Sequence, residues 1–102
     1  MSTQASPDIQ TISRLCPLFK IILVNDDKTT FQFVVSVLMQ VFGKKYEEAL
    51  VVTTEVHKTG AGLAGIYPLE TAELKRDQTL SLARTQGFPL QVTIEQVEVS
   101  GF

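Results

Sequence analysis

The chain has 102 residues, of which 44% are hydrophobic and 20% are charged, and its formal net charge is −2. This length predicts one domain built around a single core. The slight negative charge disfavours a nucleic-acid partner, because phosphate binding usually requires a basic surface. No membrane partner is expected either, since the apolar run Ile21 to Val24 is far shorter than the about 20 residues that a spanning helix needs.

Cys16 is the only cysteine, so we expect neither an intrachain disulfide nor a cysteine-based metal site. His57 is the only histidine, and a single histidine without a second nitrogen or sulfur ligand does not predict zinc. We therefore expect no metal and no cofactor. The first residues lack the pattern of a secretory signal, which favours the cytoplasm or, as another reducing compartment, a plastid stroma.

The composition changes near Pro17. Residues 1–16 are mostly polar and predict a flexible N-terminal extension, whereas residues 17–99 predict the folded domain. Within that domain, hydrophobic periodicity and turn residues predict six elements in the order β-α-α-β-α-β. These elements are Leu18–Val24, Thr30–Phe42, Tyr46–His57, Leu63–Tyr67, Pro68–Gly87 and Phe88–Val99. The predicted fold is a small α/β (α+β) sandwich, with three helices on a three-stranded, mainly antiparallel sheet.

Three side chains rich in hydrogen-bond acceptors, Asn25, Asp26 and Asp27, follow the first strand directly. They are typical of a turn that ends a strand, but the same acceptors also suit a bound cation. Adjacent carboxylates on an extended chain point in opposite directions, so they do not predict an acid–base pair, and we expect no enzyme. Thr29 and Gln32 have the spacing of a capping box at the start of the first helix.

Two further patterns require interpretation. Besides its main apolar stripe, the first helix carries a second apolar row, Phe31, Val34 and Val37, which predicts either deep burial or an apolar groove. Residues 60–65 match the spacing GxGxxG of dinucleotide-binding loops. That mechanism needs a strand before the loop and a helix after it. The predicted order is the reverse, so we reject nucleotide binding.

Taken together, these motifs resemble the ClpS adaptor family over roughly residues 18–95. The resemblance rests on the run 19–27, on the pair Val56-His57, on residues 65–67 and on scattered positions. The scattered positions are Thr29, Phe33, Val34, Val37, Leu38, Gly60, Glu70, Ala72, Glu73, Lys75, Pro89, Leu90 and Thr93. ClpS-like proteins are adaptors and not enzymes. The resemblance implies binding of substrates with a bulky hydrophobic N-terminal residue, an N-degron, and their delivery to the N-domain of a Clp AAA+ unfoldase of the ClpA or ClpC type.

The resemblance also implies three groups of residues with distinct roles. One group would hold the α-amino group of the substrate: Asn25, Asp26 and His57. A second would form the pocket for its side chain: Thr29, Phe31, Val34, Val37, Thr53, Val56 and Leu90. A third, Glu70 and Lys75, would dock the adaptor on the unfoldase, and the N-terminal extension would engage it during delivery.

The chain departs from the family pattern at Phe31 and Thr53, where many bacterial members carry Met. Met is flexible, whereas Phe31 is stiff and Thr53 is short with a polar tip, so we expect a narrower or shifted residue preference. We assign Asp26 to the amine and Asp27 to the turn and helix start. The alternative function is a non-catalytic interaction module, because the C-terminal domain of the ribosomal stalk protein has a comparable small α/β fold.

Overall fold

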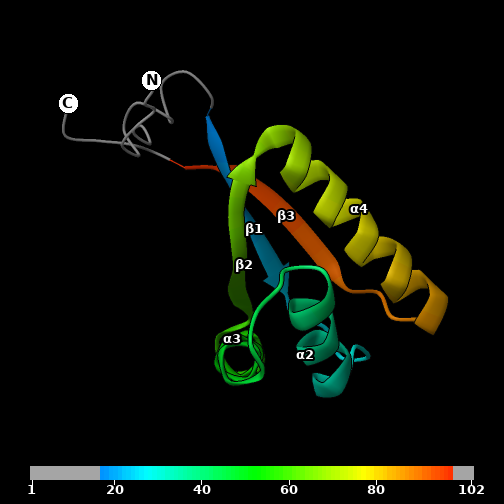
Figure 1. The fold of residues 1–102 in the computed structure, drawn as a ribbon. Helices are drawn as coiled ribbons and strands as arrows, with labels where there is room; N and C mark the ends of the chain where they lie inside the picture. Colours follow the sequence, from blue (N-terminus) through cyan, green and yellow to red (C-terminus); the bar gives the residue numbers. More distant parts are fainter. Residues whose placement is uncertain (1–16, 98–102) are drawn as a thin grey trace, which may run out of the picture.

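The computed structural model describes residues 17–97, and the predicted fold class and element order are confirmed. The elements are β1 (Leu18–Val24), α2 (Phe31–Gln40), α3 (Tyr46–Thr59), β2 (Ala61–Pro68), α4 (Leu69–Gln86) and β3 (Gln91–Gln96). β1 is the central strand of a three-stranded antiparallel sheet, with β2 and β3 on either side of it. α2 and α3 lie together at the end of the sheet where β1 ends, and α4 runs beside the strands (Figure 1).

One face of the sheet packs against the helices. Ile21 and Leu23 of β1 are fully buried, and the residues opposite them on β3, Ile94 and Val92, pack against the same core. α2 contributes four buried side chains to this core: Val34, Val35, Val37 and Leu38. The second apolar row of α2 is thus buried except at its first member. α2 therefore buries one side in the core and leaves Phe31 exposed at its start.

β2 begins two residues earlier than predicted, at Ala61 and not at Leu63. It approaches α3 closely because Gly62 has no side chain. A Cβ atom at Gly62 would lie 2.7 Å from Cγ2 of Val56. This close approach holds the last turn of α3 against the sheet.

The predicted capping box of Thr29 and Gln32 is wrong. The N-cap of α2 is Thr30, whose hydroxyl oxygen accepts a hydrogen bond from the Phe33 N–H at 3.1 Å. Thr29 precedes the N-cap, and its hydroxyl donates to the carboxylate of Asp26.

The C-terminal ends of α3 and α4 are both capped by glycine in a left-handed conformation. α3 extends to Thr59, beyond the predicted end at His57, and stops at Gly60, which adopts a left-handed φ of +96°. α4 is confirmed from Leu69 to its C-cap at Gly87. β3 is shorter than the predicted range 88–99, of which residues 98 and 99 lie outside the described residues.

The predicted N-terminal extension, residues 1–16, also lies outside the described residues. Within residues 17–97, none of the helices combines the length and the apolar character that crossing a membrane would require.

We expect the variant T30A to lower the free energy of unfolding by about 1 kcal/mol, because the N–H of Phe33 loses its side-chain partner. T30D should restore most of this loss, since aspartate also caps and its charge suits the helix N-terminus. Urea unfolding of both variants measures the effect. A T30A variant as stable as the wild type would contradict the assignment of Thr30 as the cap.

Candidate functional site

The turn between β1 and α2 is built around the carboxylate of Asp26. Its Oδ1 accepts hydrogen bonds from the backbone N–H groups of Lys28 and Thr29, both at 2.8 Å, and its Oδ2 accepts the Thr29 hydroxyl. Asp27 lies exposed on the same turn. The prediction that Asp27 closes this turn is therefore wrong, and Asp26 closes it.

The same hydrogen bonds favour the ionised form of Asp26. Burial by itself raises the pKa of this carboxyl, but the hydrogen bonds from Thr29 and Lys28 and the charge of Lys28 lower it, and the net pKa lies below the ordinary aspartate value. A carboxylate has about four acceptor positions. Three are occupied within the turn, so the Asp26 carboxylate retains capacity for a further donor.

A backbone hydrogen bond ties this turn to the end of α3. The N–H of Asn25 donates to the carbonyl of Gly60 at 2.9 Å. His57 lies in the last turn of α3, and its ring meets the ring of Phe31 edge to face, with the centroids 5.2 Å apart. The three residues predicted for the amine, Asn25, Asp26 and His57, are thus carried by two segments that contact each other.

Sequence analysis used Gly60 only in the rejected GxGxxG match and as one position of the family resemblance. The Gly60 carbonyl accepts a hydrogen bond from the N–H of Asn25. The left-handed φ of +96° at Gly60 allows α3 to turn directly into β2. A glycine just after a helix carries information about that turn, but nothing in the sequence indicates which N–H its carbonyl will accept.

The residues predicted for the hydrophobic pocket differ in exposure. Six of them are buried: Thr29, Val34, Val37, Thr53, Val56 and Leu90. Phe31 is 38% exposed and is the outermost member of the set. The Thr53 hydroxyl donates to the Ala49 carbonyl at 2.7 Å, so its polar end is satisfied within α3. Thr53 can therefore act as a short apolar residue.

Two surface grooves of about 540 Å³ lie elsewhere on the molecule, and neither is lined by Asn25, Asp26 or His57. One lies between the end of α2 and the middle of α4. The other is lined by Pro17, Phe19, Pro68, Leu69, Glu70 and Thr71. The predicted docking residue Glu70 is thus exposed beside an apolar groove at the start of α4.

The second predicted docking residue, Lys75, is bound within the fold. Its Nζ donates to the carbonyl of Val41 at 2.7 Å and lies 5.2 Å from the ring centroid of Tyr67. Burial raises the pKa of Tyr67 above its ordinary value of 10.0.

The part of the chain that the structure describes contains no cluster of three or more His, Cys, Asp or Glu side chains that could hold a metal ion.

Comparison with known proteins assigns the chain to a family. The model of the family described as ATP-dependent Clp protease adaptor protein ClpS matches residues 15–93. The chain belongs to the ClpS family. ClpS adapter proteins similar to it include that of Wolinella succinogenes, 49% identical over 78 residues, which cover 76% of each chain. The ClpS of Lawsonia intracellularis is 41% identical over 97 residues, which cover 93% of this chain and 89% of the relative.

A solved ClpS structure has the same fold. Agrobacterium tumefaciens ClpS2 bound to L-phenylalaninamide superposes with a TM-score of 0.76 and is 32% identical. The match covers 79% of this chain and 98% of that one. The resemblance on which the sequence analysis relied is therefore confirmed at the level of family and fold.

In this ClpS-family chain, the charge of Asp26 should stabilise the fold in a pH-dependent way. Because folding lowers the pKa of Asp26, its contribution is complete above the unfolded pKa of about 3.9 and is lost as the pH falls through the lower folded pKa. The variant D26N keeps an acceptor oxygen for the turn but loses the charge.

We expect wild type to exceed D26N in free energy of unfolding by a constant amount between pH 7 and about pH 5, and by less below about pH 4. Urea unfolding at a series of pH values measures this difference. D27N is the matched control, because Asp27 lies exposed on the same turn. A difference between wild type and D26N that does not change with pH would contradict the role of the Asp26 charge.

Proposed function

We propose that this chain is an adaptor that binds proteins through a free, bulky hydrophobic N-terminal residue and delivers them to a Clp AAA+ unfoldase of the ClpA or ClpC type. It would act in the cytoplasm and perform no chemical step itself. The observation that supports the proposal is that the β1–α2 turn, which carries Asn25 and Asp26, is hydrogen-bonded to the end of α3, where His57 meets the exposed ring of Phe31.

An α-ammonium group carries a positive charge and three N–H donors. In the proposed complex it would donate to the amide oxygen of Asn25, to the Asp26 carboxylate and to the unprotonated ring nitrogen of His57. The lowered pKa of Asp26 supports this role, because it extends to lower pH the range in which the carboxylate is charged while the amine is protonated. An acetylated N-terminus has neither the charge nor the three donors.

The amine and the side chain would both be needed for useful affinity. Charge-assisted hydrogen bonds contribute about 1.5–3 kcal/mol each, and burial of a Leu or Phe side chain adds about 1.5–3 kcal/mol. Micromolar binding requires about 8 kcal/mol after the costs of ordering the peptide. Neither part suffices alone, so the site would select for a free amine together with a large apolar side chain.

The comparisons support this chemistry. The Agrobacterium tumefaciens ClpS2 structure holds L-phenylalaninamide, which combines a free α-amino group with a benzyl side chain. The relatives are named adapters of the ATP-dependent Clp protease. Both observations favour the adaptor over the alternative of a ribosomal-stalk-like interaction module.

The docking surface would lie at the start of α4, around Glu70. This carboxylate is exposed, and the groove beside it is lined by Phe19 and Leu69. Protein interfaces usually have an apolar centre and a polar edge, and an apolar groove with a charged residue at its rim fits this pattern. Lys75 would be shared between this surface and the interior contact with Val41.

Binding should depend on the free amine. We expect a labelled peptide that begins with Phe to bind the wild type at about micromolar concentration, and the same peptide with an acetylated N-terminus to bind at least about 100-fold more weakly, because charge and donors are lost together. Fluorescence anisotropy measures both affinities. D26N should weaken binding of the free peptide far more than D27N. Equal binding of free and acetylated peptides would refute the proposal.

Phe31 should restrict which N-terminal residue is accepted. Its ring is stiff and is held edge to face by His57, so peptides beginning with Leu, Phe, Tyr or Trp should differ in affinity by more than about tenfold between best and worst. The variant F31M should narrow this range, because Met adapts its shape. F33M is the matched control, since Phe33 packs against Phe88 instead. Equal wild-type affinity for all four peptides would contradict this prediction.

A further inference from the structure

The ammonium group of Lys75 occupies a junction between three elements. Lys75 belongs to α4, the carbonyl that it contacts is that of Val41 at the end of α2, and the ring that it faces is that of Tyr67 on β2. The residues Lys75 and Val41 are 34 positions apart in the sequence. This contact joins α4 to the helix that carries part of the proposed substrate site.

The end of α2 needs such a partner. Val41 is the C-cap of α2, and the last carbonyls of a helix have no donor within the helix itself. The C-terminal end of a helix also carries partial negative charge, which favours a nearby cation. The last turn of α2 contains no basic residue of its own. Lys75 supplies both the missing donor and the missing cation from another helix.

The surroundings of Lys75 hold its side chain in this position. Its Nζ lies 5.2 Å from the ring centroid of Tyr67 and 6.0 Å from that of Phe42, within the range of cation–π attraction. The Tyr67 ring in turn lies against Gly65, where an added Cβ would come within 2.6 Å of the ring. Because Gly65 has no side chain, the Tyr67 ring can lie over it and face the Lys75 ammonium.

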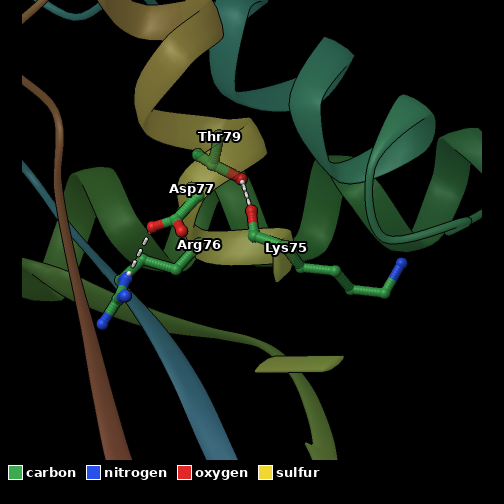
Figure 2. A network of polar contacts seen from close by, with 4 residues as sticks. All are labelled: Lys75, Arg76, Asp77 and Thr79. Carbon is green, nitrogen blue, oxygen red and sulfur yellow. Dashed lines mark hydrogen bonds and ion pairs between the residues drawn. The ribbon is translucent and has the colours of Figure 1, made fainter. Parts of the chain in front are cut away.

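The neighbouring residue on α4 has a different role. Figure 2 shows the side chains of Lys75 and Arg76 leaving α4 in opposite directions, with Arg76 beside Asp77. The Nε atom of Arg76 donates to Asp77 at 3.2 Å in an exposed pair. Arg76 thus offers a matched control that carries the same charge on the same helix without the contact to α2.

We propose that Lys75 is a positioning residue for the substrate site: it holds the C-terminal end of α2 and thereby sets the position of Phe31 at the other end. α2 has ten residues, so its two ends are about 15 Å apart, and a shift at Val41 tilts the whole short helix. This inference rests on the proposed function for the role of Phe31. It also means that loss of unfoldase binding in a Lys75 variant does not by itself identify a docking contact.

The test compares three variants, K75M, K75R and R76M, in the absence of any unfoldase. K75M keeps an apolar stem but loses the donor and the charge, so its melting temperature should fall by about 5–10 °C. Its affinity for a peptide with a free N-terminal Phe should fall about three- to tenfold. The NMR signals of the Phe31 and His57 rings should shift in the free protein. K75R should restore most of each effect, and R76M should cause none.

Three results would overturn the proposal. The first is a K75M variant with the wild-type melting temperature. The second is a lower melting temperature with unchanged ring signals of Phe31 and His57, which would limit Lys75 to stability. The third is an R76M variant that behaves like K75M. If the wild type does not bind the peptide, the proposed function fails. The melting temperatures and ring signals then still decide whether Lys75 positions α2.

Discussion

The chain must reverse between the buried strand β1 and the buried helix α2, and it does so around a single carboxylate. Asp26 accepts the N–H groups of Lys28 and Thr29 together with the Thr29 hydroxyl, which fixes the turn and leaves Thr30 as the N-cap of α2. The same carboxylate is the proposed partner of the substrate amine. The fold and the proposed binding would therefore depend on one charged group, and only a variant that keeps its acceptor oxygen can separate the two roles.

The site is held from several directions. The Asn25 N–H is bound to the Gly60 carbonyl, which places the turn beside the last turn of α3. Phe31 at the start of α2 contacts His57 on α3, and Gly62 lets β2 approach that helix closely. At the far end of α2, Lys75 binds the last turn. A domain of this size buries few residues, so contacts of this kind between elements hold the polar site in place.

The sequence predicts the order and type of every described element because its apolar periodicity and its capping residues agree. It does not distinguish Asp26 from Asp27, or Thr29 from Thr30, because adjacent residues of one type differ only in the backbone geometry of the turn. The inward role of Lys75 was also missed. A lysine on a polar helix usually faces solvent, and its bond to Val41 joins positions 34 residues apart without any local pattern.

The central claim, that the acceptors at the end of β1 receive an amine, is tested most directly by NMR titration of labelled protein. L-leucinamide and 4-methylpentanamide have the same apolar chain and amide, but only L-leucinamide has the α-amino group. We expect L-leucinamide to shift the side-chain signals of Asn25, Asp26 and His57 in a saturable way, and 4-methylpentanamide to leave them unchanged at the same concentration. Equal shifts from both compounds, or saturable shifts confined to residues outside this cluster, would contradict the account.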